Sequence, residues 1–193
     1  MRHSRTFLAA VSALALAIPA AAAPPIGSPA PPFTLTDLDG SVFSLDQAVR
    51  SHKAVVVMFI ATQCPYSNAY NDRMRDMAAS YGKQGILFLG INSNKTEPAE
   101  ETRAHARKHG FAFAVAKDPE NTVADLYGAK HTPEIFVVDP RGVLRYHGRI
   151  DENYEDASKV SSPDLKNALD ALLAGKPVAT SETKAFGCSI KRV

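Results

Sequence analysis

The stretch that decides the fold runs from residue 54 to residue 67 and reads AVVVMFIATQCPYS. Its first seven residues, 54–60, are all apolar, which is typical of a strand buried on both faces in the middle of a sheet. Cys64 follows where this strand gives way to a helix, and Pro65 suits the first turn of a helix. The stretch therefore predicts a central strand, a short loop and a helix that begins at a cysteine.

Cys64 is the strongest candidate for chemistry in the chain. At the start of a helix, unpaired backbone N–H groups and the helix dipole favour an anion, and a thiolate is such an anion. We therefore expect the pKa of the Cys64 thiol to fall from about 8.5 towards 7 or below, which favours thiol–disulfide exchange or peroxide reduction. The other interpretation is a buried, inert cysteine, which is a common state of a free cysteine.

Strands and helices alternate on both sides of this stretch. The pattern predicts a hairpin over 33–45 with a turn at Asp39-Gly40, and a mixed α/β sheet in which parallel buried strands come first and a hairpin comes last. The further strands are expected at 86–91, 113–116, 135–138 and 143–147, and the helices at 46–50, 65–81, between Pro98 and Gly110, at 122–127 and at 163–174.

The first residues are typical of a secretory signal peptide: a basic start, an apolar run over 7–18, and then alanines up to Ala23. The alternative, an uncleaved membrane anchor, needs about 20 apolar residues, and this run is shorter. We expect a signal peptide over 1–22, a Pro-rich lead-in over 23–32, one domain over 33–175 and a tail over 176–193. The mature chain is then exported, periplasmic in a bacterium, and not bound to the membrane.

Composition excludes several classes of protein. The chain has 193 residues, 45% of them hydrophobic, and a formal charge of +2, and the charge falls to zero without the basic residues Arg2 and Arg5 of the leader. A neutral domain has no electrostatic surface for nucleic acid. The only cysteines, Cys64 and Cys188, are too few for a disulfide scaffold or a four-cysteine metal site. No phosphate loop, dinucleotide fingerprint or haem motif is present, so we expect no metal and no cofactor.

Three stretches carry a resemblance to a known family. The strand over 55–60, the sequence Cys64-Pro65-Tyr66-Ser67, and Thr132-Pro133 before the strand at 135–138 resemble a thioredoxin-fold protein. The chain is more similar still to the peroxiredoxin-like (redoxin, alkyl hydroperoxide reductase/thiol-specific antioxidant) branch, from about Pro29 to the C-terminus. The resemblance implies a thioredoxin-like fold, with a central mixed sheet flanked by helices, a short N-terminal hairpin and a C-terminal tail.

The resemblance also implies a substrate site around Cys64. Pro133 is similar to the cis-proline that faces the active cysteine in this fold. The backbone of Thr132 is then offered to an extended peptide substrate, and the remaining substrate-binding residues are expected to be Pro65, Tyr66 and Ser67. The hydroxyl of Ser67 is expected to donate a hydrogen bond to the thiolate.

The chain departs from the patterns of both families. Thioredoxins have Trp and a second Cys where this chain has Gln63 and Ser67, so no disulfide forms within the motif. Peroxiredoxins have Pro and Thr where this chain has Val57 and Ala61, so their peroxidatic signature is absent. The strand over 54–60 also lacks the proton-handling carboxylate of thioredoxins.

Cys188 lies 124 positions after Cys64 in a tail with few anchors of its own. It can be the resolving partner of Cys64, or form a permanent structural disulfide worth about 4–5 kcal/mol in chain entropy, or stay an unpaired or intermolecular thiol. The sequence leaves these three roles open, because a disulfide needs a Cα separation below about 7 Å.

Several other polar residues have two interpretations each. His131 and Arg149 are candidates for electrostatic support of the Cys64 thiolate, or else a surface histidine and an Arg149–Asp151 surface pair. His105 and His109 lie four apart on one helix face, where we favour a solvated face over a metal pair. Acidic residues at the start of that helix are expected to complement its dipole; they are Glu97, Glu100 and Glu101.

Together these patterns predict an exported thiol–disulfide oxidoreductase with Cys64 as its nucleophile, and resolution by Cys188 is one of the three roles left open for that residue. Its partners are then protein or small-molecule thiols and disulfides, or peroxide. One alternative is a peroxide-reducing antioxidant acting through Cys64. The other is a non-catalytic binding module whose cysteines are structural.

Overall fold

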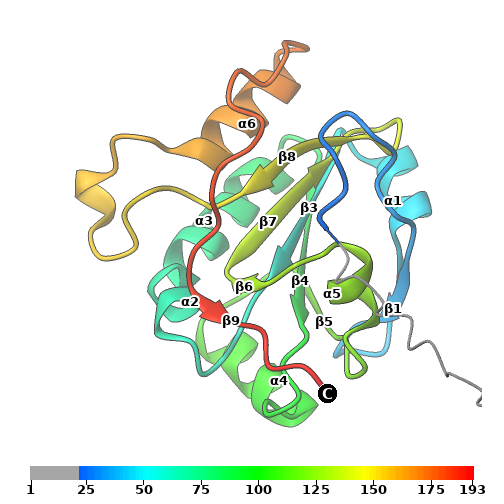
Figure 1. The fold of residues 1–193 in the computed structure, drawn as a ribbon, viewed down its shortest axis with the longest axis vertical. Coiled ribbons are helices and arrows are strands. Elements are labelled where there is room, and N and C mark those ends of the chain that lie inside the picture. The colour runs from blue at the N-terminus through cyan, green and yellow to red at the C-terminus, as the bar shows by residue number, and fades with distance from the viewer. Residues whose placement is uncertain (1–21) are drawn as a thin grey trace, which may run out of the picture.

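A five-stranded sheet in the order β5-β4-β3-β7-β8 forms the centre of the computed structural model, which describes residues 22–193 (Figure 1). Neighbours β3, β4 and β5 run parallel, β7 runs antiparallel to β3, and β8 runs antiparallel to β7. This mixed sheet confirms the predicted α/β class. Its strands are β3 (Ala54–Phe59), β4 (Ile86–Asn92), β5 (Ala114–Lys117), β7 (Glu134–Val138) and β8 (Leu144–Gly148).

The central strand β3 is fully buried, as its apolar run predicts, and it divides the core in two. Alternate side chains point to opposite faces of a strand, so Val55 and Val57 belong to one apolar cluster and Val56 and Met58 to the other. The first cluster packs against α1 (Leu45–Ser51) and α5 (Thr122–Leu126), and the second against α3 (Asn71–Gly82) and α6 (Asp164–Leu173). Helices therefore cover both faces of the sheet.

The N-terminal part of the described chain packs onto this frame. Strands β1 (Thr34–Thr36) and β2 (Val42–Ser44) form the predicted antiparallel hairpin. The Pro-rich segment before them is held against β8, where the amide of Gly27 donates to the carbonyl of Leu144 at 2.9 Å. The predicted signal peptide lies outside the described residues, apart from its last residue.

The single helix expected over 65–81 is wrong, because the structure has two helices there. α2 (Pro65–Ala69) ends before Tyr70, whose amide donates to the carbonyl of Ser67 in a tight turn, and α3 starts at Asn71. Tyr70 is completely buried, and its hydroxyl donates to the carboxylate of Asp151 at 2.9 Å. This distant contact holds the break in place, and sequence periodicity cannot register it.

The C-terminal tail is the second difference, because it is anchored along its length. After α6 it runs past the edge of β8, and Figure 1 shows it (in red) continuing down to α2. The amide of Thr183 donates to the carbonyl of His147 at 2.9 Å, and that of His147 donates to Ser181 at 3.0 Å. A two-stranded antiparallel pair then forms between β6 (His131–Thr132) and β9 (Cys188–Ser189), neither of which the sequence predicts.

The remaining elements are α4 (Ala99–Lys108), at the predicted place between Pro98 and Gly110, and a 3-10 turn over Ala157–Lys159. Within residues 22–193, no helix has both the length and the apolar character needed to cross a bilayer.

Candidate active site

Cys64 stands between β3 and α2, immediately before the first helical residue, as its sequence predicts. Its side chain is 3% exposed. The sulfur accepts a hydrogen bond from the amide of Ser67 at 3.4 Å, and the thiol donates to the carbonyl of Thr132 at 3.2 Å. The main chain therefore supplies both hydrogen bonds that orient this thiol.

The hydrogen bond expected from the Ser67 hydroxyl comes from the Ser67 amide instead. The Ser67 side chain is fully buried, and its hydroxyl accepts a hydrogen bond from the amide of Ala61 at 3.1 Å. Ser67 thus braces the loop between β3 and α2. Of its neighbours in the motif, Pro65 is exposed and Tyr66 is half-buried.

The loop across from Cys64 contains the cis peptide bond that the resemblance implies, between Thr132 and Pro133. The carbonyl of Thr132 is the acceptor for the Cys64 thiol. Within the described residues, two buried polar atoms of this loop have no hydrogen-bond partner: Nδ1 of His131 and Oγ1 of Thr132. The loop thus brings unsatisfied polar groups and an acceptor carbonyl to the edge of the site.

Cys188 lies beside this loop as part of β9, which pairs with β6. Its main chain pairs in register with that of Thr132, and the next residue, Ser189, pairs with His131. The fold thereby brings the two cysteines together across 124 positions of sequence, although no disulfide joins them in this structure.

The environment of Cys188 favours the neutral thiol. The pKa of Cys188 is raised to about 11, mainly by burial and then by the hydrogen bond and charge of the adjacent Cys64, against a smaller lowering by the amide of Tyr66. The Cys188 thiol is therefore protonated at neutral pH. Neither cysteine is in a disulfide.

Three aromatic rings pack beside α2. The ring centroids of Tyr66 and Tyr154 are 4.5 Å apart, and Phe186 lies 6.2 Å from each of them. Phe186 belongs to the tail and precedes Cys188 by two residues, so the tail covers part of the Tyr66 side chain. These rings form an apolar border to the site.

A buried glutamate just before α4 anchors the loop that precedes Cys64. Glu97 is 2% exposed and accepts hydrogen bonds from the amides of Thr62 (2.7 Å) and Gln63 (3.1 Å). Glu101 accepts from the side chains of the same two residues. Glu100 and Glu101 stand in the first turn of α4, as expected, and Glu100 pairs with Arg103 on its surface. Glu97 precedes the helix, and both Glu97 and Glu101 bond a loop 34 or more positions away, a role that the sequence does not predict.

A second buried glutamate holds the cis-proline loop. Glu134 accepts hydrogen bonds from the amides of Lys130 (2.7 Å) and His131 (2.8 Å), and from the ring of His147 (2.8 Å). Burial by itself raises the pKa of Glu134, but these hydrogen bonds outweigh it and hold the pKa below its usual value. In the sequence, the only sign that Glu134 anchors this loop is its place directly after Pro133, at the start of β7.

Comparison with known proteins identifies the family. Residues 26–147 match the model of the AhpC/TSA family. The chain belongs to the AhpC/TSA family. This match includes Cys64, Thr132 and Pro133, and it confirms the resemblance inferred from those residues. Cys188 lies beyond the matched residues.

Relatives within this family carry two kinds of name. The chain is 29% identical over 120 residues to a thiol-disulfide oxidoreductase ResA of Geobacillus thermodenitrificans, which covers 62% of this chain and 67% of the relative. It is also 29% identical over 127 residues to a chloroplastic peroxiredoxin Q of Triticum aestivum, covering 62% of this chain and 57% of the relative. The relatives are thus named as thiol–disulfide oxidoreductases and as peroxiredoxins.

Solved structures confirm the thioredoxin-like fold. A hypothetical protein from Sinorhizobium meliloti is 33% identical, with a TM-score of 0.81 over 89% of this chain and 97% of its own. A putative thioredoxin from Neisseria meningitidis is 20% identical, with a TM-score of 0.63 over 78% of this chain and 93% of its own. The AhpC/TSA chain described here therefore has the thioredoxin fold that its sequence predicts.

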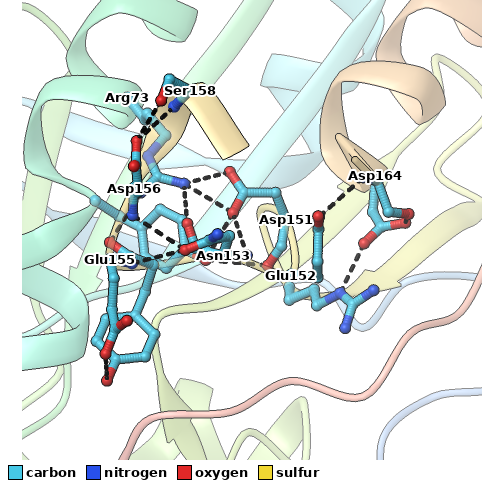
Figure 2. Close-up of polar contacts among 12 residues, drawn as sticks. Arg73, Asp151, Glu152, Asn153, Glu155, Asp156, Ser158 and Asp164 are labelled. Carbon is cyan, nitrogen blue, oxygen red and sulfur yellow. Dashed lines mark hydrogen bonds and ion pairs between the residues drawn. The ribbon is translucent and has the colours of Figure 1, made fainter. Parts of the chain in front are cut away.

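The structure assigns Arg149 a different partner from the one expected. Its Nε donates to the carboxylate of Asp164 at 2.7 Å, whereas Asp151 pairs with Arg73 at 2.6 Å (Figure 2). Figure 2 shows Arg73 pointing at Asp151, with Asn153 beside them in the loop that follows β8. The predicted Arg149–Asp151 pair is wrong, and Arg149 is committed to α6 rather than to the thiol.

The two helix histidines of α4 lie against an apolar ring. Their ring centroids are 4.4 Å apart, and His105 packs on Phe111 at 6.0 Å, so the two histidines are partly exposed and partly covered by an aromatic ring. Burial and the neighbouring His109 lower the pKa of His105. Among residues 22–193, no group of three or more His, Cys, Asp or Glu side chains is placed to hold a metal ion.

Proposed function

We propose that this AhpC/TSA chain is an exported thiol–disulfide oxidoreductase in which Cys64 is the nucleophile and Cys188 its resolving partner. The observation that carries the proposal is the in-register pairing of Cys188 with Thr132, whose carbonyl accepts a hydrogen bond from the Cys64 thiol. Export is supported by the basic, apolar and small residues over 1–23.

The reaction needs only the two sulfurs. The Cys64 thiolate attacks one sulfur of a substrate disulfide, and the other sulfur leaves as a thiolate, so a mixed disulfide forms. Cys188 then loses its proton and attacks the sulfur of Cys64, which releases the second substrate thiol and closes a Cys64–Cys188 disulfide. The substrate is reduced by two electrons, and an external dithiol restores the two cysteines.

The raised pKa of Cys188 sets the order of these steps. At neutral pH Cys188 is held as a neutral thiol, so Cys64 is the sulfur that attacks first. Part of the rise comes from the hydrogen bond and charge of Cys64, and both are lost once Cys64 is in a mixed disulfide. The pKa of Cys188 is therefore lower in the mixed disulfide than in the reduced protein, while the contribution of burial remains.

Peroxide reduction is the second candidate, favoured by the similarity to peroxiredoxin Q. The Cys64 thiolate then attacks a hydroperoxide, an alcohol or water leaves, and the resulting sulfenic acid condenses with Cys188 to the same disulfide and water. The residues Val57 and Ala61, which replace the Pro and Thr of peroxiredoxins, weigh against it.

Disulfide mapping with rapid kinetics tests the proposal. The reduced protein is mixed with a disulfide or with hydrogen peroxide, quenched with an alkylating reagent, and digested for mass spectrometry. We expect a Cys64–Cys188 peptide that forms faster with the disulfide than with peroxide, a stable mixed disulfide in Cys188→Ser, and no reaction in Cys64→Ser. Faster oxidation by peroxide favours the second candidate, and a protein whose function survives Cys64→Ser is a binding module instead.

A further inference from the structure

The main-chain edge of the cis-proline loop is already occupied by the tail of the same chain. An exposed strand edge binds extended polypeptides through its main-chain N–H and C=O groups, a mode called β-augmentation. Beside Cys64 that edge is β6, and β9 pairs with it in antiparallel register. Beyond β9, the amide of Ile190 donates to the carbonyl of Lys130 at 3.0 Å, which extends the pairing by one residue.

The fit of the tail against this loop is close at Gly187. A Cβ at this position would lie 2.1 Å from the carbonyl oxygen of Thr132, and the backbone has a φ of 141°, a conformation that side chains disfavour. The Thr132 carbonyl is the same oxygen that accepts the Cys64 thiol. No second chain can therefore approach this carbonyl as Gly187 does while the tail remains in place.

The tail is fixed on both sides of β9, so it stays in place as the sulfurs react. Before β9, Thr183 bonds to β8 and Phe186 packs against Tyr66 and Tyr154. After β9, the amide of Lys191 donates to the side chain of Asn94 at 2.7 Å, and its carbonyl accepts from the amide of Lys95 at 2.8 Å. These contacts make the tail a wall of the site rather than a loose end.

We propose that residues 186–190 are a built-in strand that fills the peptide-binding edge beside Cys64, so that the protein reacts with low-molecular-weight disulfides in preference to polypeptide disulfides. This inference rests on the proposed function, because it names the substrate class of the same thiol. A small disulfide needs access only to the sulfur of Cys64. An extended polypeptide would have to pair with the main chain of Thr132, which is already paired with the main chain of Cys188.

The test uses Cys188→Ser, in which β9 remains and the reaction stops at the mixed disulfide. The probes are glutathione disulfide and a decapeptide whose central cysteine is disulfide-bonded to glutathione. The rate at which each probe reacts with Cys64 is divided by its rate with a free small thiol, and this ratio is the normalised rate. In the mixed disulfide that forms, the Cys64 thiolate bonds to one probe sulfur and the other sulfur leaves as a thiolate. We expect the normalised rate to be at least about tenfold higher for glutathione disulfide, as expected for one or more lost main-chain hydrogen bonds.

A second variant displaces the strand without touching either sulfur. Gly187→Ala, added to Cys188→Ser, forces the tail away from the Thr132 carbonyl, and amide hydrogen exchange at Ile190 reports the displacement. We expect the peptide rate to rise at least about tenfold and the glutathione disulfide rate to change less than about twofold. Gly175→Ala is the matched control, because Gly175 also has a positive φ but has nothing within 4 Å of an added Cβ.

The outcomes separate the two proposals. Equal normalised rates for the two probes in Cys188→Ser overturn the proposal of a built-in strand. An unchanged peptide rate in a variant whose Ile190 amide exchanges freely also overturns it. If the Ile190 amide stays protected in Gly187→Ala, Ile190→Pro removes that amide and the peptide rate is measured again. A Cys64 that reacts with neither probe overturns the proposed function itself.

Discussion

Thr132 and Cys188 are opposite each other in an antiparallel strand pair, although 56 positions of sequence separate them. The carbonyl of Thr132 also accepts a hydrogen bond from the thiol of Cys64, so the same residue bonds the Cys64 side chain and pairs with the main chain of Cys188. The tail therefore borders the candidate site around Cys64.

The acidity of Cys188 is expected to depend on Cys64. The pKa of Cys188 is raised to about 11, mainly by burial and in part by the hydrogen bond and charge of Cys64. In Cys64→Ser the charge is lost, so we expect the pH at which Cys188 is half-alkylated by iodoacetamide to fall below the wild-type value. Lys191→Gln is the opposite control, because the charge of Lys191 lowers this pKa and its removal raises the midpoint. A midpoint unchanged in Cys64→Ser contradicts the contact.

Glu97 is expected to be essential to the stability of the loop before Cys64. Glu97→Gln keeps the size of the side chain but turns an NH2 group towards N–H donors, some of which then lack an acceptor, and this costs about 2–4 kcal/mol of unfolding free energy. Urea unfolding measures the loss. Glu100→Gln removes only an exposed pair with Arg103 and should cost less than about 0.5 kcal/mol, so equal losses in the two variants would argue against the anchor.

Glu134 should make the folded state sensitive to acid. Its pKa is lowered in the folded protein, so its stabilisation is present above its usual pKa and is lost as the pH falls through the folded value. We expect the unfolding free energy to fall between about pH 5 and pH 3, and Glu134→Gln to flatten that part of the profile. Glu120→Gln, at an exposed position, should leave the slope unchanged. An identical slope in both variants would count against this role.

The ion pair between Arg73 and Asp151 is largely buried, with exposed fractions of 18% and 5% for the two side chains. Asp151 also accepts from the hydroxyl of Tyr70, so Asp151→Asn leaves a buried guanidinium without its charge partner. We expect a loss of about 3–5 kcal/mol in unfolding free energy, measured by urea titration. Asp72→Asn breaks an exposed pair with Arg75 and should cost less than about 0.5 kcal/mol. A loss as small as the control's would mean that the pair is not held in the folded protein.

Much of the frame was predictable from local sequence. The apolar run over 54–60 predicts β3, and alternating strands and helices predict a mixed α/β sheet, because burial on both faces and the two periodicities leave a direct imprint on the residues. The break at Tyr70 was not predictable, because it depends on a hydrogen bond to Asp151.

The roles of isolated polar residues were harder to predict. Glu97 and Glu101 look like ordinary acids at a helix start, and the pairing of Arg149 with Asp164 rather than Asp151 is set by the position of α6. A polar side chain carries no periodic signal, and its partner depends on which distant segment the fold brings within about 3 Å.

The sequence by itself determined that Cys64 lies at the start of a helix after a buried strand, that the chain resembles proteins with a thioredoxin-like fold, and that it has a second cysteine with which a disulfide can form. Only the tertiary structure decided that Cys188 pairs with Thr132 and that the tail fills the edge beside the thiol. The physical reason is that local patterns reflect burial and backbone geometry over a few residues. Contacts across 124 positions exist only once the whole chain has packed.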